Sequence, residues 1–368
     1  MIIKSITARN ISIPLRRPIH NPAFTFKECK YTLVTVRTEC GIEGWSFAFG
    51  LHQAKAAVEE LAATLVGRRI DTRRLYHMML NAQVTRWDRG GISMRAVSAI
   101  DIALWDIVGK SCGLPIYKML GQYREKTPVY YSGGHYPTDS DKTADMLAYL
   151  EKDLVPTIER GFRSFKIKIG RGRVQQDLER IALCRELIGP DCQLMLDAFC
   201  AYDPDTIIPM ARKFEKHDIT FLEEPVPLDD IPGCAHVAAN VSMPVAMGES
   251  HYTMAQFRDI INSRAARILQ PDVAYVGGIT GFIQYAGIAA FHGLKLAPHW
   301  CHDLSVQLAL SIPEVMGLEY MDEDSALFLI QKVIANPVKA KDGFVEAPEG
   351  PGHGLILDEK AVASYLVG

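Results

Sequence analysis

Short apolar runs alternate with amphipathic helical segments from about residue 129 to residue 320, and this alternation constrains the fold more than any other feature of the 368-residue chain. The runs have the length of buried strands, and the segments between them have helical periodicity. The eight strand candidates are Val129–Ser132, Ser164–Ile169, Leu194–Leu196, Ile219–Leu222, Val245–Gly248, Ile268–Gln270, Leu294–Ala297 and Leu318–Tyr320. Helices are expected between them, for example at Gln176–Ile188, Pro209–His217, Ala255–Ser263 and Phe282–His292. Eight such units in succession predict a TIM barrel, an α/β fold.

A doubly wound sheet is the alternative α/β architecture, but it normally carries a glycine-rich fingerprint after its first strand. The nearest match, Gly170-Arg171-Gly172, lacks the third glycine and follows a later strand. Residues 1–125 have the pattern of an α+β domain, with strands at Ile2–Arg9 and Tyr31–Thr38. We therefore expect three parts: the α+β domain at 1–125, the barrel at 126–330, and a C-terminal segment at 331–368 that packs back on the first domain.

The charge balance and the sequence pattern disfavour several classes of protein. The formal net charge is −3 and no stretch is rich in lysine or arginine, so a nucleic-acid partner is not expected. The eight cysteines form no CxxC pair, the first residues alternate like a strand without an apolar signal segment, and glycines interrupt the uncharged run Val273–Leu294. We expect a cytoplasmic protein with no membrane partner, which acts on a small molecule.

Ionisable residues stand where seven successive strand candidates end. TIM barrels build their active sites at this end of the strands, because the loops that follow the strands meet there. In chain order the residues are Lys166 and Lys168, Asp197, Glu223 and Glu224, Glu249, Asp272, His299, and Glu319. The series predicts one polar site at the mouth of the barrel.

Three carboxylates of this series, Asp197, Glu223 and Glu249, are spaced 26 residues apart, about one strand–helix unit. Anions at adjacent strand ends repel one another unless a cation lies between them. Oxygen-only ligands suit a hard divalent ion, and Mg²⁺ takes few carboxylates while it keeps water or substrate oxygens. The spacing therefore predicts a Mg²⁺ site. The alternative is a set of salt bridges to three lysines: Lys166, Lys168 and Lys295.

The flanking residues are candidate acid–base groups. Lys166 and Lys168 share one face of a strand, and two neighbouring ammonium groups are expected to lower each other's pKa until a lysine is a base near neutral pH. His299 lies one strand beyond Asp272, and a carboxylate at one imidazole nitrogen leaves the other free to accept a proton. An exposed strand face is the alternative for the lysines. Burial or a zinc site is the alternative for His299, with these neighbours: Trp300, Cys301 and His302.

A metal site between a lysine base and a His–Asp pair suits abstraction of a proton α to a carboxylate. The metal would stabilise the enediolate intermediate, and either flanking group could take or return a proton. Glu319 is expected to be protonated and to donate a hydrogen bond to the developing oxyanion.

The same residues, with two motifs of the first domain, resemble the enolase superfamily and its mandelate racemase-like subgroup. The motifs are Ala99-Ile-Asp-Ile-Ala-Leu-Trp105-Asp106, Gly113-Leu-Pro-Ile-Tyr-Lys-Met-Leu-Gly121, Lys166-Ile-Lys168, Leu196-Asp197-Ala198, Glu223-Glu224-Pro225, Gly248-Glu249, Gln270-Pro-Asp272, His299 and Leu318-Glu319. The resemblance implies a modified (β/α)7β barrel under an N-terminal α+β capping domain that the C-terminal tail completes. It also implies these site roles: Mg²⁺ on Asp197, Glu223 and Glu249, the base Lys168, the acid–base pair His299–Asp272, a hydrogen-bonding Glu319, and Lys166 at the substrate carboxylate.

One position departs from the family pattern. The family often has Asn two residues after its first metal ligand, where the amide meets the substrate, and this chain has Phe199. In the family that the chain resembles, substrate specificity depends on a mobile loop of the capping domain, which corresponds here to residues 16–27. We expect His20 and Arg17 of that loop to bind substrate. A second candidate loop contains Trp87 and its neighbours.

The activity that the resemblance favours is Mg²⁺-dependent dehydration of a sugar acid to a 2-keto-3-deoxy acid, a hydro-lyase reaction. Racemisation or epimerisation of a 2-hydroxy acid, or cycloisomerisation of a sugar lactone, would begin with the same chemistry. An alternative from another class is a Schiff base on Lys166 or Lys168, as in metal-independent aldolases. The chain is also expected to form a homo-oligomer.

Overall fold

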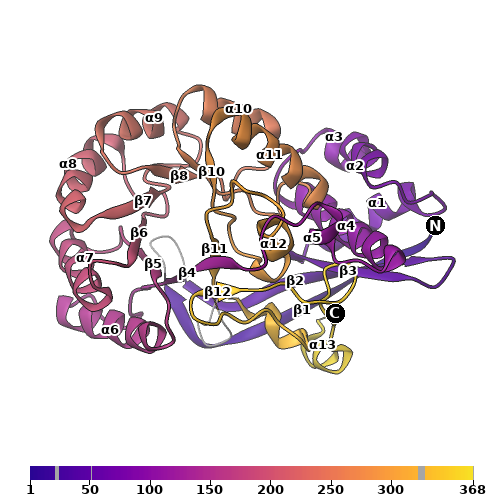
Figure 1. Cartoon of the computed structure of the whole chain (residues 1–368), viewed down its shortest axis with the longest axis horizontal. Helices are drawn as coiled ribbons and strands as arrows, with labels where there is room; N and C mark the ends of the chain where they lie inside the picture. Colours follow the sequence, from indigo (N-terminus) through magenta and orange to yellow (C-terminus); the bar gives the residue numbers. More distant parts are fainter. Residues whose placement is uncertain (21–24, 51, 322–327, 368) are drawn as a thin grey trace.

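The computed structural model describes the chain except residues 21–24, 51, 322–327 and 368. In the described part, the strands form two sheets, an antiparallel one near the N-terminus and a curled, mainly parallel one in the rest. Figure 1 shows the curled sheet surrounded by its helices, with the antiparallel sheet beside it. The predicted fold class, a modified barrel with an N-terminal α+β capping domain, is confirmed.

The N-terminal domain pairs its strands in sequence order, and its hairpin is longer than expected. Pairing continues to Ile19 with Phe26 and His20 with Thr25, after an irregularity that follows Pro14. Outside residues 21–24, the region 16–27, expected as a loop, therefore has strand backbone and contains the last two pairs of the hairpin. Ladder hydrogen bonds use the main chain, so they form whatever the side chains are. The elements are β1 (Ile3–His20), β2 (Thr25–Thr38), β3 (Glu43–Phe49), α1 (Ala54–Leu65), α2 (Thr72–Asn81), α3 (Gln83–Arg86), α4 (Gly91–Cys112) and α5 (Ile116–Met119).

All eight predicted barrel strands are present in the described residues; the first seven lie side by side in sequence order, and the eighth pairs with the first. They are β4 (Thr127–Gly133), β5 (Ser164–Lys168), β6 (Gln193–Asp197), β7 (Ile219–Glu223), β8 (Val245–Met247), β9 (Ile268–Leu269), β10 (Lys295–Leu296) and β11 (Leu318–Tyr320). A parallel bridge between Leu296 and Val315 closes the barrel beside β11. The intervening helices are α6 (Thr143–Glu159), α7 (Val174–Ile188), α8 (Pro204–Phe214), α9 (Ile231–Asn240), α10 (Met254–Asn262), α11 (Gly278–His292) and α12 (His302–Ala309).

The helix expected at Pro209–His217 begins five residues earlier, and a 3-10 turn (Glu215–His217) ends it. The Asp203 side chain accepts a hydrogen bond from Thr206 N at 2.9 Å, and a proline stands at the first helical position. Both features are typical of a helix start, and they outweigh the cost of the internal Pro209. The uncharged run Val273–Leu294 forms a buried turn and α11. Among the described residues, no helix has the length and apolar character needed to span a membrane.

The two-residue period of the strands builds both the barrel core and the site above it. In β6, Leu194 and Leu196 face the surrounding helices, whereas Met195 points into the barrel. A layer of side chains from five strands and from the residue after β10 fills that interior: Tyr130, Met195, Phe221, Ala246, Ile268 and Ala297. Two residues further along, Asp197 and Glu223 project on the same side as this layer. The alternation therefore places the acidic groups directly above a closed apolar floor.

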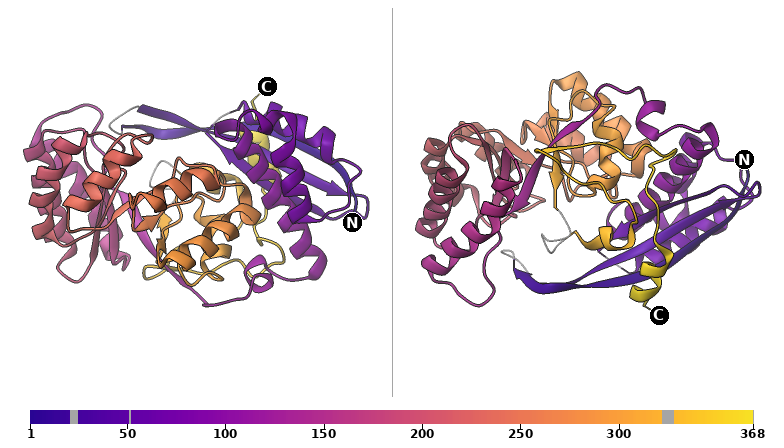
Figure 2. Two further views of the ribbon diagram at one scale, coloured as in Figure 1. Left: turned by 90° about the horizontal axis from the view of Figure 1, so that it is seen from above. Right: turned by 60° about the horizontal axis from the view of Figure 1, so that its bottom comes forward.

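The C-terminal segment contacts both sheets. The segment begins with a 3-10 turn (Leu329–Val333). Strand β12 (Phe344–Val345) then pairs with β4, and helix α13 (Glu359–Tyr365) lies beside β1 (Figure 2). Leu366 forms a bridge with Ile11, and Arg9 forms an ion pair with Glu359 at 2.6 Å. The last residues of the chain therefore fasten the capping sheet to the barrel.

Candidate active site

Strand register brings the first three site residues side by side. Lys168 lies opposite Asp197, and Asp197 lies opposite Glu223, at the ends of three adjacent parallel strands. All three side chains are buried, and Lys168 Nζ donates a hydrogen bond to Asp197 Oδ2. This part of the predicted cluster is assembled by the barrel alone.

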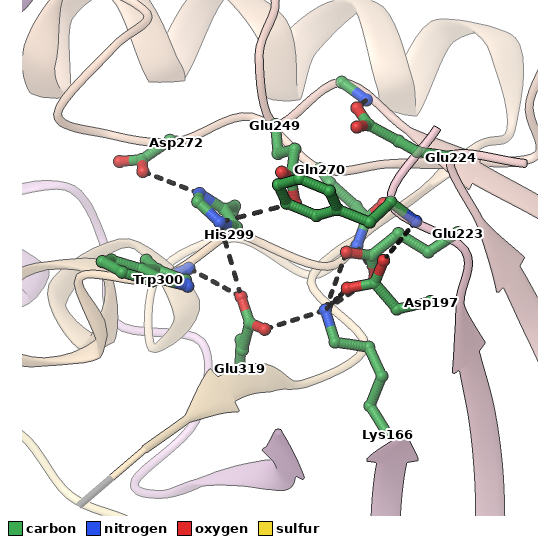
Figure 3. A network of polar contacts seen from close by, with 12 residues as sticks. Lys166, Asp197, Glu223, Glu224, Glu249, Gln270, Asp272, His299, Trp300 and Glu319 are labelled. Atoms are coloured by element: carbon green, nitrogen blue, oxygen red, sulfur yellow. Dashed lines mark hydrogen bonds and ion pairs between the residues drawn. The ribbon is translucent and has the colours of Figure 1, made fainter. Parts of the chain in front are cut away.

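Lys166 connects the carboxylates across the barrel mouth. Its Nζ atom lies 2.7 Å from Glu223 Oε2, 2.8 Å from Glu319 Oε1 and 3.6 Å from Asp197 Oδ2. Figure 3 shows this side chain pointing from its strand into the cluster, with His299 on the far side of Glu319. The Gln270 amide donates to Glu223 at 2.6 Å. The described site is therefore one buried polar network.

The lysines do not have the lowered pKa values that their spacing predicts. Burial lowers the pKa of Lys166, but the charges of Glu223 and Glu319 outweigh burial and hold it well above its ordinary value. Burial and Lys166 also lower the pKa of Lys168, but the charges of Asp197, Glu223 and Glu249 together raise it above its ordinary value. The expectation is wrong, because the carboxylates in direct contact with each ammonium group outweigh the effect of the other lysine.

The charges around Glu319 favour its ionised form, contrary to the expected protonated acid. Burial raises its pKa, but the charge of Lys166, with His299 and Lys168, lowers it well below the ordinary value. Its carboxylate accepts hydrogen bonds from Lys166 and, at 3.0 Å, from Trp300 N. In this arrangement Glu319 accepts hydrogen bonds and orients its neighbours.

His299 and Asp272 form the predicted pair. The imidazole Nδ1 lies 2.9 Å from Asp272 Oδ2, and Nε2 lies 3.4 Å from Glu249. Burial lowers the pKa of His299, but Glu249 and Asp272 raise it to about 9. The ring also stacks on Trp300, with centroids 5.4 Å apart. The imidazole is therefore fixed in orientation, and the carboxylates around it favour its protonated form.

The neighbours of His299 do not form a zinc site. The ring of His302 packs on Tyr320, and its Nε2 lies 2.8 Å from Gln331 Nε2. Among the described residues, no three acidic, histidine or cysteine side chains are grouped closely enough to hold one metal ion as they stand. Instead, the lysine ammonium groups lie between the carboxylates.

The donor set nevertheless fits a magnesium ion. Burial and the charges of Asp197 and Glu249 raise the pKa of Glu223 well above its ordinary value. These carboxylates therefore repel one another electrostatically. Burial and Glu249 similarly raise the pKa of Glu224 to about 8. A buried set of carboxylate oxygens at adjacent strand ends is the kind of donor set that Mg²⁺ accepts.

A cavity of about 330 Å³ opens onto this network and contains residues that sequence reasoning missed. His135 lies two residues after the end of β4, so the rule of strand ends could have found it. Its buried Nδ1 has no hydrogen-bond partner among the described residues. Arg95 and Tyr275 gave no comparable signal. The lining residues are Phe26, Phe49, Gly50, Arg95, His135, Lys168, Phe199, Glu249, Ser250, Tyr275, His299, Trp300 and Met321.

The expected specificity residues are only partly described. Arg17 and His20 belong to β1 by their backbone, but their side chains lie outside the described residues. Phe199 lines the cavity and lies 5.5 Å from Lys168 Nζ, measured to its ring centre. The indole of Trp87 is exposed at the end of α3.

Both halves of the chain match known protein families. Residues 4–121 match the mandelate racemase/muconate lactonizing enzyme N-terminal domain, and residues 150–361 match the enolase C-terminal domain-like family. The L-talarate/galactarate dehydratase of Salmonella typhimurium is 32% identical over 91% of this chain and 82% of its own length. The 3,6-anhydro-α-L-galactonate cycloisomerase of Streptomyces coelicolor is 30% identical over 92% of each chain.

A solved structure extends this similarity to the whole fold. A racemase from Streptomyces coelicolor, crystallised with bound magnesium, superposes with a TM-score of 0.90 at 28% identity and covers 100% of both chains. Similar proteins thus include a dehydratase, a cycloisomerase and a racemase. Together with the buried network at the barrel mouth, these matches show that the chain belongs to the mandelate racemase/muconate lactonizing subgroup of the enolase superfamily.

Proposed function

We propose that this enzyme abstracts the α-proton of a sugar acid with the help of Mg²⁺ and then eliminates the β-hydroxyl to give a 2-keto-3-deoxy acid. The observation that carries the proposal is that Lys168 and His299 line the same cavity, together with Glu249. Dehydration needs a base for the α-proton and an acid for the departing hydroxyl. One cavity with both kinds of group meets this requirement.

The metal ligands in this proposal are Asp197, Glu223 and Glu249. When bound, Mg²⁺ supplies positive charge for the oxygens of the substrate carboxylate, which become more negative as the proton leaves. With these carboxylates engaged in holding the ion, Lys168 would be free to act as a base and Lys166 would be free to contact the substrate carboxylate. His299, oriented by Asp272, then donates a proton to the departing hydroxyl, while Glu319 keeps Lys166 and Trp300 in place.

Racemisation or epimerisation is the second candidate, and the same two groups favour it. Inversion at the α-carbon requires one group to remove a proton and another to return a proton from the opposite face. Lys168 comes from β5 and His299 from the loop after β10, so the two groups reach the cavity from separate elements. Cycloisomerisation of a sugar lactone shares the first step.

A Schiff-base aldolase is disfavoured, because a Schiff base needs a neutral amine. The pKa values of Lys166 and Lys168 are both raised by the carboxylates around them, after burial has lowered them. Trapping with borohydride and a carbonyl substrate tests this alternative directly. We expect no covalent adduct.

The test of the proposal is a screen of mono- and diacid sugars for 2-keto acid production with Mg²⁺, with and without EDTA. The screen includes galactarate and L-talarate, which differ in configuration at one α-carbon. Lys295→Ala is the control for Lys168→Ala, since Lys295 is an exposed barrel lysine. Dehydration predicts a keto acid that disappears with EDTA and in Lys168→Ala. Interconversion of the epimers without keto acid would favour the second candidate, and turnover that survives EDTA would contradict both.

A cytoplasmic location and a homo-oligomeric state are further expectations of this proposal. Cell fractionation and light scattering of the purified protein would test them.

A further inference from the structure

A stripe of polar residues on helix α4 of the capping domain faces the loop that carries Asp272. The residues are spaced by three or four positions and so share one helix face: Arg95, Ser98, Asp101 and Trp105. Helix α4 packs against α11, which begins where this loop ends (Figure 1). The motif that includes Asp101 and Trp105 therefore does more than close the first domain.

Asp101 caps helix α11 from the other domain. The N-cap residue of α11 is Gly277, which has no side chain to accept a hydrogen bond. Asp101 Oδ2 accepts from Thr280 N at 2.9 Å, the third helical residue, as an N-cap side chain would do. A Cβ on Gly278 would lie 2.5 Å from Asp101 Oδ2, so a glycine is needed there for α4 to approach.

Two more contacts fasten the same segment. Ser98 Oγ accepts from Gly277 N at 2.9 Å, and Trp105 Nε1 donates to Thr280 Oγ1 at 2.9 Å. Ser98 and Asp101 are buried. The first turn of α11 is therefore held by side chains of the capping domain.

Hydrogen bonds continue from this segment to the acid–base pair. Asp272 Oδ1 accepts from Ala274 N at 2.7 Å, while its Oδ2 lies 2.9 Å from His299 Nδ1. Arg95 lies over the ring of Tyr275, 4.0 Å from its centre. A shift of the turn would move the carboxylate that orients His299.

We propose that Ser98 and Asp101 are positioning residues, through which the capping domain sets the geometry of the Asp272–His299 pair. This inference rests on the proposed role of His299 as an acid–base group. Lys168 is held by strand register within the barrel, so its geometry is independent of this contact. Loss of the contact then damages one side of the site and leaves the other intact.

The test compares Asp101→Ala with Asp101→Asn in the full-length protein loaded with Mg²⁺. Exchange of the α-proton in D₂O is followed by NMR with galactarate and with L-talarate. Asp101→Ala is expected to slow exchange of the proton facing His299 by about 10- to 100-fold, since small displacements of reacting groups cost that much. Exchange of the proton facing Lys168 is expected to stay within about twofold, and Asp101→Asn, which keeps an acceptor oxygen, to restore most of the loss.

Asp106→Ala is the matched control, because Asp106 is a buried acid of the same helix that contacts other elements. Its Oδ1 accepts from His353 N and its Oδ2 from Trp45 N, both at 3.2 Å. The Asp106→Ala variant should lower the stability of the fold without slowing exchange of one α-proton more than the other. If Asp101→Ala slows both protons equally, or neither, the positioning role is overturned. If it does not fold, Ser98→Ala decides by the same criterion.

A measurement without turnover separates this inference from the proposed function. The hydrogen-bonded Nδ1 proton of His299 is expected to give a low-field NMR signal that His299→Asn should remove. We expect the signal in the wild-type protein and in Asp106→Ala, and its shift or loss in Asp101→Ala. An unchanged signal would overturn the inference, whereas an absence of proton exchange in the wild-type protein would overturn the proposed function alone.

Discussion

The two sides of the site are built in different ways. Lys168, Asp197 and Glu223 stand at the ends of adjacent strands in direct register. His299 and Asp272 instead follow the short strands β10 and β9 on loops, and helix α4 of another domain holds the loop after Asp272. The comparison teaches that one half of the site is a property of the barrel, whereas the other half depends on how two domains meet.

The largest effect is expected on the barrel side, from loss of the metal ligands. Asp197→Asn, Glu223→Gln and Glu249→Gln should each weaken Mg²⁺ binding and lower turnover by on the order of 10³-fold or more, because several kcal/mol of charge stabilisation is lost. The fold should persist, since barrel stability resides in the apolar layers. Calorimetry of Mg²⁺ binding and steady-state rates measure both effects. Near wild-type rates in two of the three variants would refute the assignment.

The second prediction concerns the domain contact, where Asp101 is a buried acid. Burial raises the pKa of Asp101 from 3.8 to about 7, against hydrogen bonds from Thr280 and Ile279 that favour the ionised form. A carboxyl group with a raised pKa in the folded state stabilises the fold below its unfolded pKa, and this stability is lost as the pH rises from about 4 to about 7.

Asp101→Asn cannot ionise and should not show this loss. From pH 5 to pH 8, we expect the wild-type free energy of unfolding to fall by roughly 3 kcal/mol relative to the variant. Urea denaturation at both pH values measures the difference. A difference that does not change with pH would show that Asp101 is not a titrating group of this contact.

The smallest effect is expected from Phe199, which follows the barrel-side ligand Asp197. Phe199 and Cys200 have positive φ values of 46° and 59°, a region that Asn adopts more readily than a bulky residue. Phe199→Asn should therefore keep or slightly raise stability, by up to about 1 kcal/mol. It also replaces an aromatic wall by an amide, so the ratio of kcat/KM for a polyhydroxy acid over its deoxy analogue should rise about tenfold.

Cys200→Asn is the control for this prediction. Cys200 has the same kind of backbone strain, but its Sγ lies 3.4 Å from Glu224 Oε2. The Cys200→Asn variant should relieve backbone strain without changing the substrate preference. Equal shifts in both variants would mean that the turn, and not the Phe199 side chain, sets the preference.

The barrel side of the site could be predicted from the sequence because its signals are local. The two-residue period of a strand and the 26-residue spacing are enough to bring Asp197 and Glu223 together. The charge states were not predictable in the same way. Spacing placed Lys166 near Lys168, but the pKa of each lysine depends on carboxylates from other strands.

The domain contact could not be predicted, because it depends on packing between residues far apart in sequence. The motif around Asp101 indicated a helix of the first domain, but its partner Thr280 lies 179 residues away. The long hairpin of β1 and β2 was missed for a related reason. Its pairing depends on backbone hydrogen bonds, which leave no pattern of apolar residues.

The most direct test of a two-sided site is α-proton exchange in D₂O with Lys168→Ala and His299→Asn. If the two groups stand on opposite faces of the bound acid, His299→Asn should still exchange the configuration that faces Lys168, and Lys168→Ala only the other. Each loss should be on the order of 10²–10⁴-fold, and neither variant should complete a reaction that needs both groups. If His299→Asn exchanges both configurations like the wild-type protein, His299 is a packed residue beside Trp300 and a one-base mechanism centred on Lys168 must replace this account.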